Sequence, residues 1–186
     1  AAEVAAELDA SLDLLLVRKI GLPGQPELAM GAVADGAEPT IVRNNDVIEL
    51  SGVSEQDFDA VCRVERAELE RRRRRYLGDR ARSEVRGRIA IIVDDGIATG
   101  ATTLAAIRAM RMQQPKELVL AVPVAPIDTI KKLHPEVDVI VCLDTPDDLG
   151  AIGYFYRDFR QVSDDEVIAI LKRFPANKAP RSPAES

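Results

Sequence analysis

The chain has few of the side chains on which metal and redox chemistry usually depend. Its 186 residues include one histidine, His134, and two cysteines, Cys62 and Cys142. His134 has no cysteine or histidine near it in the sequence, so we expect a surface residue rather than a metal ligand or a catalytic base. Both cysteines lie in apolar surroundings. This favours two reduced thiols in a cytoplasmic protein over a disulfide or a zinc site.

Other absences exclude whole classes of protein. No apolar run approaches the roughly 20 residues that cross a membrane, and no signal-peptide pattern is present. The chain has no Gly-Lys-Ser/Thr ending, which disfavours a nucleoside triphosphate loop, and no Gly-x-Gly-x-x-Gly fingerprint of a dinucleotide site. With 46% apolar and 30% charged residues, the composition is that of a soluble globular domain.

One stretch dominates what is present. Residues 89–102 read IAIIVDDGIATGAT: an apolar strand, two carboxylates, a turn of small residues and the start of a helix. The unbroken apolar run predicts a strand covered on both faces, as in a parallel sheet. The turn presents backbone N–H groups and two hydroxyls at a helix N-terminus, which predicts an anion site. Because Asp94 and Asp95 would repel a bare phosphate, a phosphorylated sugar suits the stretch best.

This stretch resembles the binding signature of type I phosphoribosyltransferases for phosphoribosyl pyrophosphate (PRPP). It departs from the signature at Gly96, where the family usually carries an aliphatic residue. The resemblance implies that Asp94 and Asp95 are the catalytic carboxylates, which accept hydrogen bonds from the ribose hydroxyls. It implies that the 5′-phosphate binds to the residues of the turn, namely Ala98, Thr99, Gly100, Ala101 and Thr102. Magnesium would bind through PRPP oxygens and water rather than directly to the protein.

The expected fold is α/β, an open and mainly parallel sheet flanked by helices. We expect one phosphoribosyltransferase-like domain over residues 1–174, with a helical insertion at about 44–84 and a C-terminal hood at about 144–162. A low-complexity tail follows at 175–186, with the composition of a disordered segment. Helices are predicted at 1–9, 54–78, 102–112, 127–133 and 163–174, and strands at 12–17, 89–93, 117–124 and 137–143. A hairpin is predicted around residues 31–42.

The beginning of the chain departs from the alternation of an α/β fold. A helix normally follows a strand, so the helix at residues 1–9 implies a strand before it. Family members carry a pyrophosphate-binding loop after that strand, and the sequence does not contain one. We therefore expect either an N-terminally truncated fragment or a protein that has lost this contact. Arg18 and Lys19 close the predicted strand at 12–17 and resemble an Arg-Lys pair that faces the pyrophosphate; the alternative is a solvated strand end.

Four of the seven aromatic residues fall between residues 154 and 159, after the last predicted core strand. They resemble the base-binding hood of the family, with Tyr154 and Phe155 as the residues that would contact the base. The alternative is a small satellite core. Ala98 occupies the position where hypoxanthine-guanine enzymes place an aspartate, so the acceptor base stays open.

Charge is unevenly distributed around a net value of −6. Residues 71–88 hold nine arginines against two acids, and residues 136–166 hold nine acids against two arginines. This asymmetry predicts an electrostatic contact within or between chains, or an anion-binding face. The five arginines at 71–75 complement a helix C-terminus without any ligand. Because aromatic residues are not interleaved with them, nucleic-acid binding is disfavoured.

These observations predict a magnesium-dependent phosphoribosyltransferase that acts on PRPP and a nitrogenous base, as a cytoplasmic homo-oligomer. Two alternatives stay open. One is a non-catalytic PRPP-binding regulator of the same fold, with RNA binding through residues 71–88 as a variant. The other is an inactive fragment.

Overall fold

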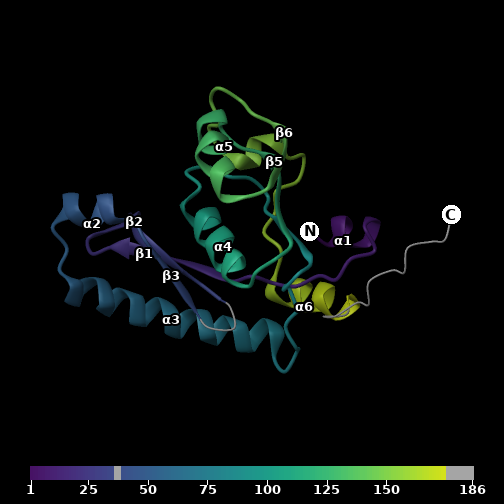
Figure 1. Cartoon of the computed structure of the whole chain (residues 1–186), viewed down its shortest axis with the longest axis horizontal. Coiled ribbons are helices and arrows are strands. Elements are labelled where there is room, and N and C mark those ends of the chain that lie inside the picture. Colours follow the sequence, from purple (N-terminus) through teal and green to yellow (C-terminus); the bar gives the residue numbers. More distant parts are fainter. Residues whose placement is uncertain (36–38, 175–186) are drawn as a thin grey trace.

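The structure of the protein is a computed structural model, which describes residues 1–35 and 39–174 (Figure 1). Within these residues, six strands form two separate three-stranded sheets, one antiparallel and one parallel. In chain order the elements are α1 (Ala2–Glu7), β1 (Val17–Leu22), β2 (Gln25–Ala34), β3 (Thr40–Arg43), α2 (Asn45–Ser51), α3 (Glu55–Leu77), β4 (Ile89–Val93), α4 (Ala101–Met112), β5 (Glu117–Val124), α5 (Ile127–Leu133), η1 (His134–Glu136), β6 (Val139–Asp144), η2 (Ile152–Phe155) and α6 (Asp164–Arg173).

The first sheet has the order β1-β2-β3 and is antiparallel throughout. The α/β class is confirmed, but the expected mainly parallel sheet is not, because half of the strands belong to this sheet. Its geometry follows from its connections. A tight turn joins Leu22 to its partner Gln25, and Gly24 within it adopts φ 82°. So short a connection can only reverse the chain, whereas parallel strands need a crossover of a dozen or more residues.

Helix α3 runs along one face of the antiparallel sheet (Figure 1). Ser54 caps it by accepting a hydrogen bond from the Asp57 N–H, and Gly78 ends it, as the sequence predicted. Phe58 and Cys62 on α3 are buried against Ile20 of β1 and Met30 of β2. These four residues form the core of this half of the molecule.

Helix α4 lies between the two sheets (Figure 1). Its buried residues are mostly small and include Ala105, Ala106 and Ala109. Ile107 points into the second core, together with Leu118 and Leu120 of β5. Small side chains on several sides of the helix allow both sheets to approach it closely, so α4 joins the two halves of the chain.

The second sheet has the order β4-β5-β6 and is parallel. Residues of β5 alternate in burial, and the buried set packs toward α4 and α5. The opposite face includes Ile89, which is 58% exposed, and Val141 and Leu143, which are 46% and 80% exposed. The prediction that residues 89–93 are covered on both faces is therefore wrong for the described chain: one face has helices, and the other is largely open.

Residues 12–16 also differ from their prediction. The expected strand at 12–17 is displaced along the chain, since β1 begins at Val17 and residues 12–16 have no strand assignment. All five are half-buried. Leu16 accepts a backbone hydrogen bond from Asp35, but no ladder joins residues 12–16 to β4 within the described residues. A strand needs a neighbour to complete its hydrogen bonds, and this segment has none on the β4 side.

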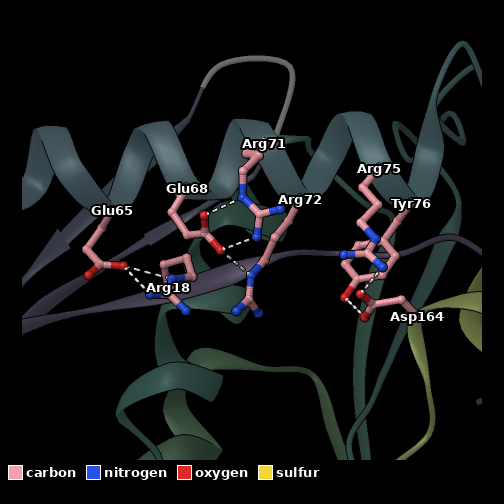
Figure 2. A network of polar contacts seen from close by, with 8 residues as sticks. All are labelled: Arg18, Glu65, Glu68, Arg71, Arg72, Arg75, Tyr76 and Asp164. Atoms are coloured by element: carbon pink, nitrogen blue, oxygen red, sulfur yellow. Dashed lines mark hydrogen bonds and ion pairs between the residues drawn. The ribbon is translucent and has the colours of Figure 1, made fainter.

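The arginine run at the end of α3 is engaged within the chain. Arg71 and Arg72 both bind Glu68, Arg73 and Arg74 bind Glu70, and Arg75 binds Asp164 of α6. Figure 2 shows the Glu68 pairs and the Asp164 contact, in which Tyr76 also donates a hydrogen bond to Asp164. The basic segment, residues 71–88, thus contacts the acidic segment, residues 136–166, within the chain. This is one of the options that the sequence predicted.

No helix in the described part of the chain is long and apolar enough to cross a membrane. The expected disordered tail at 175–186 lies outside the described residues.

Candidate functional site

The signature stretch occupies the carboxyl end of β4 and the N-terminus of α4. Asp94 and Asp95 follow the last strand residue, and Gly100 immediately precedes the helix. Gly100 has φ 79°, a left-handed conformation that strains any residue with a Cβ. A Cβ at this position would also stand 3.0 Å from the Thr129 Cγ2. Glycine is therefore required here by both backbone and packing.

Backbone contacts hold the turn from several directions. The Asp94 N–H donates to the Ala121 carbonyl at 3.3 Å, and the Ile97 N–H donates to the Val124 carbonyl at 3.0 Å. The Thr129 hydroxyl donates to the Ala98 carbonyl at 2.8 Å. Since Ile97 and Thr129 are buried, these hydrogen bonds hold the side of the turn that faces the protein. The other side of the turn is open to solvent.

The solvent-facing side of the turn has the features of an anion site. Ala98, Thr99 and Thr102 are exposed. Among the described residues, no side chain caps α4, and the first turn of this helix contains no acidic residue. The N–H groups at the start of a helix have no partner within the helix, and their dipoles favour a negative charge. Of the five residues that the sequence assigned to the ribose 5-phosphate, Gly100 is buried and Ala101 is half-buried, and the other three are exposed.

The two carboxylates lie beside this surface. Asp94 Oδ1 accepts a hydrogen bond from the Asp95 N–H at 3.0 Å. Within residues 1–35 and 39–174, neither carboxylate forms an ion pair with a lysine or an arginine. Surrounding protein withdraws water from Asp94 and raises its pKa above the ordinary aspartate value; the negative charge of Asp95 adds to this rise, and the hydrogen bond opposes it.

Tyr156 is a site residue that the sequence did not single out. Its hydroxyl donates to the Asp95 carbonyl at 2.6 Å, and its ring lies 4.9 Å from the Phe159 ring. Partial burial raises the pKa of Tyr156, and the charges of Asp95 and Asp94 raise it further. The only signal in the sequence was the aromatic cluster itself, which does not say which ring reaches the turn.

Gly96 provides a second contact between the turn and the segment that follows β6. A Cβ at Gly96 would stand 2.7 Å from the Ile152 Cγ2 and 3.1 Å from the Val124 Cγ1. Ile152 therefore fills the space that an aliphatic side chain at position 96 would need, which accounts for the departure from the family signature at Gly96.

Arg18 and Lys19 line a cavity of about 600 Å³ that also includes Thr102 and the β1–β2 turn. The predicted pyrophosphate residues are thus brought near the predicted phosphate site. Arg18 is engaged in the described structure: its side chain pairs with Glu65 of α3 at 2.7 Å (Figure 2). Sequence patterns gave no sign of this partner, which lies 47 positions away.

The two residues predicted to contact a base lie in η2. Tyr154 is 83% exposed and Phe155 is 39% exposed. Tyr154 lies over Gly150, where an added Cβ would stand 3.1 Å from the Tyr154 Cε2. In the described residues, the hydrogen bond to the turn comes from Tyr156 and not from either of these rings.

The carboxylates of the site supply only part of the coordination that a divalent cation requires. Residues 1–35 and 39–174 contain no group of three or more histidine, cysteine, aspartate or glutamate side chains that could hold a metal ion. Asp94 and Asp95 supply hard oxygen ligands of the type that Mg²⁺ prefers, but only two of them. This arrangement fits a magnesium ion held mainly by ligand oxygens and water.

Comparison with known proteins gives consistent matches. The phosphoribosyl transferase domain family matches residues 1–158. Two proteins of Mycobacterium tuberculosis, from strains CDC 1551 / Oshkosh and ATCC 25618 / H37Rv, are each named "Putative phosphoribosyl transferase"; each is 47% identical over 171 residues, or 92% of this chain. The chain spans 38% of the length of these relatives. The crystal structure of TT1426 from Thermus thermophilus has a TM-score of 0.79 at 36% identity, covering 94% of this chain and 81% of that one.

Proposed function

Because this chain belongs to the phosphoribosyl transferase domain family, we propose that it transfers a phosphoribosyl group from PRPP to a nitrogenous base. The bond between the ribose C1′ and the pyrophosphate oxygen breaks, a bond forms between C1′ and a base nitrogen, and the proton of that nitrogen leaves to solvent. One observation carries the proposal: an uncapped helix N-terminus with exposed threonines directly follows two carboxylates that have no cationic partner in the described chain.

The turn would hold the 5′-phosphate. The first N–H groups of α4 have no acceptor within the helix and would bind phosphate oxygens, and the hydroxyls of Thr99 and Thr102 would add donors beside them. Binding at this end fixes the ribose relative to the carboxylates. Fixing the reacting groups in this way supplies much of the rate acceleration of a transfer reaction.

Asp94 and Asp95 would accept hydrogen bonds from the ribose hydroxyls. As pyrophosphate departs, positive charge grows on the ribose ring, and nearby carboxylates stabilise that charge. Asp94 must be ionised for this role, and its raised pKa makes its protonation state sensitive to pH.

Arg18 and Lys19 would face the pyrophosphate, and Tyr154 and Phe155 would contact the base. The Arg18 guanidinium can bridge Glu65 and a phosphate oxygen, since it has five N–H donors. Magnesium, when bound, would neutralise part of the pyrophosphate charge through ligand oxygens and water.

A second candidate function is PRPP binding without transfer. It is favoured by the Arg18–Glu65 pair, because a cation that is already matched by a carboxylate attracts pyrophosphate less strongly. In this case the turn and the two aspartates keep their binding roles, and no pyrophosphate is released.

Calorimetry with PRPP and magnesium tests the site. Hydrogen bonds to charged groups contribute about 1.5–3 kcal/mol each, and asparagine keeps only a weaker, neutral acceptor, so Asp94→Asn/Asp95→Asn should weaken binding at least about tenfold. The matched control is Asp147→Asn/Asp148→Asn, another adjacent pair of exposed aspartates after a parallel strand, which should leave binding unchanged.

Equal affinities of the wild type and the Asp94→Asn/Asp95→Asn variant would show the site assignment to be wrong. Pyrophosphate release, measured with a panel of nucleobases, then separates the two functions. Release that depends on both PRPP and one base supports the transferase, and tight PRPP binding without release supports the binding protein.

A further inference from the structure

Glu65 is a residue of helix α3 that packing alone does not explain. The buried residues of this helix include Phe58, Cys62 and Leu69. Positions 58, 62, 65 and 69 are spaced by four, three and four residues, which places Glu65 on the same helix face as these three. A carboxylate therefore interrupts an apolar stripe, and its side chain is only 18% exposed.

Arg18 of β1 is the partner of this carboxylate. It lies two residues before Ile20, so both side chains project from the same side of the strand, and Ile20 packs against Phe58 and Cys62 of α3. Arg18 Nε and Nη2 both lie 2.7 Å from Glu65 Oε2 (Figure 2). In a partly buried ion pair, loss of hydration offsets much of the attraction, so stability alone gives little reason for this pair.

The pair lies in the wall of the cavity of about 600 Å³ that Thr102 also lines. Among the lining residues that the structure describes, the charged ones are Arg18, Lys19 and Glu65. The two cations attract an anion, and the carboxylate repels it at short range. The cavity thus combines cations suited to a diphosphate group with a carboxylate that opposes its binding.

The guanidinium of Arg18 keeps part of its binding capacity within the pair. Glu65 occupies the edge formed by Nε and Nη2. Because a guanidinium carries five N–H donors in one plane, the donors of Nη1 can bind another oxygen. A phosphate oxygen can therefore bind without breaking the pair, but it meets a cation whose charge is already matched.

We propose that Glu65 is a positioning residue that sets the specificity of the site: by neutralising Arg18, it keeps free inorganic pyrophosphate from binding tightly, while PRPP still binds. The inference rests on the proposed function, which places the pyrophosphate group of PRPP at Arg18 and Lys19. PRPP is also held at the signature turn, residues 96–102, so its pyrophosphate reaches the cavity at high effective concentration. Free pyrophosphate lacks this anchor and depends on the cavity alone.

The same balance would favour turnover. Pyrophosphate is the product that leaves once its bond to C1′ breaks, and a cavity with two unmatched cations would retain it. Release of a tightly held product can limit the rate of an enzyme. Glu65 would therefore speed the departure of pyrophosphate without weakening the binding of the 5′-phosphate at the turn.

Calorimetry in the presence of magnesium tests the proposal, with inorganic pyrophosphate and ribose 5-phosphate as separate probes. Glu65→Gln keeps the size of the side chain and removes its charge, so inorganic pyrophosphate should bind at least about tenfold more tightly than to the wild type. Ribose 5-phosphate lacks the pyrophosphate group, and its affinity should change less than about threefold. A merely structural role of Glu65 would not produce a gain confined to pyrophosphate.

Three further variants show whether the effect acts through Arg18. Glu68→Gln, on the next turn of the same helix, removes an equal charge from a carboxylate that binds Arg71 and Arg72, and it should leave pyrophosphate affinity unchanged. Arg18→Gln/Glu65→Gln should bind pyrophosphate about as weakly as the wild type. Glu65→Ala should reproduce the gain of Glu65→Gln, which keeps the test valid where one of these two substitutions disturbs folding.

Unchanged affinity of Glu65→Gln and Glu65→Ala for inorganic pyrophosphate would overturn the proposal. An equal gain for ribose 5-phosphate, in Glu68→Gln or in the double variant would overturn it as well. A failure of the proposed function is recognised separately, because the wild type would then bind neither PRPP nor ribose 5-phosphate, whatever the effect of Glu65→Gln on inorganic pyrophosphate.

Discussion

The two sheets differ in how completely the chain covers them. The antiparallel sheet has α3 on one face and α4 on the other (Figure 1), and its core residues, Ile20, Met30 and Phe58, are at most 2% exposed. The parallel sheet has α4 and α5 on one face, while Leu143 and other apolar residues of its opposite face remain exposed. Among the described residues, no strand pairs with the outer edge of β4.

The difference follows from how each sheet is connected. Antiparallel strands are joined by short turns, so one stretch of chain completes its own hydrogen bonds. Parallel strands depend on crossovers and on coverage of both faces. The candidate site lies at the carboxyl end of the parallel strand β4, which is where ligands bind in open α/β sheets. The candidate site thus lies in the half of the molecule whose sheet is covered on one face only.

The largest expected effect tests the contrast in packing. Phe58→Ala should reduce the free energy of unfolding by about 3–5 kcal/mol, because Phe58 is buried in the antiparallel core and a cavity would remain. The matched change Phe159→Ala, at a ring that is 47% exposed beside Tyr156, should cause a much smaller loss, below about 1.5 kcal/mol. Urea unfolding of both variants measures the difference.

A larger loss for Phe159→Ala than for Phe58→Ala would contradict this contrast. It would mean that the segment after β6 contributes more to stability than the antiparallel core.

Two glycines with left-handed backbones allow the two halves to be compared in function. Gly100 and Gly52 have φ values of 79° and 65°, so alanine at either position should reduce stability by about 1–2 kcal/mol through backbone strain. Gly100 stands at the signature turn, where a Cβ would also press against Thr129, whereas Gly52 ends α2 and a Cβ there would meet nothing within 4 Å. We therefore expect Gly100→Ala to weaken PRPP binding in calorimetry, and Gly52→Ala to lower the melting temperature without changing affinity.

Similar PRPP affinities for the two glycine variants would show that the conformation of the turn does not control binding. Thermal unfolding of each variant gives the strain separately, so the two effects are not confused.

The smallest expected effect concerns two carboxylates with opposite shifts. Arg71 and Arg72 on α3 hold the pKa of Glu68 at about 2, whereas loss of hydration raises the pKa of Asp94. Glu68 therefore contributes stability above its ordinary pKa, and this contribution is lost as the pH falls toward about 2. For Asp94 the sign is reversed: ionisation destabilises the fold as the pH rises through the raised pKa.

Carboxyl carbon NMR over a pH titration distinguishes these two groups. Asp95→Asn should lower the pKa of Asp94, because it removes a neighbouring negative charge. The acid limit of PRPP binding should move to lower pH in the same variant. A titration of Asp94 below that of an ordinary aspartate would contradict the expected direction.

Much of this structure could be predicted from local patterns. The Ser54 cap and Gly78 stop defined α3, the apolar run with its two acids defined β4 and the turn, and Ser163 defined the start of α6. Each of these depends on residues that are adjacent in sequence or one helical turn apart.

What could not be predicted depends on residues that are distant in sequence. The leucines at 12–16 suggested a strand, but a strand also needs a partner, and periodicity does not show whether one is present. The pairing of Arg18 with Glu65 and the hydrogen bond from Tyr156 to Asp95 join segments 47 and 61 positions apart. No motif records such contacts, because they follow from how the elements pack.

Tyr156 also gives the protein an intrinsic optical probe. The chain has three tyrosines and no tryptophan, so tyrosine emission is not obscured by a stronger indole signal. The Tyr156 hydroxyl donates a hydrogen bond to the Asp95 carbonyl. The emission of this tyrosine depends on that hydrogen bond and on nearby charge. Ligand binding at the turn can therefore be followed by fluorescence of the unlabelled wild-type chain, with Tyr156→Phe as the blank.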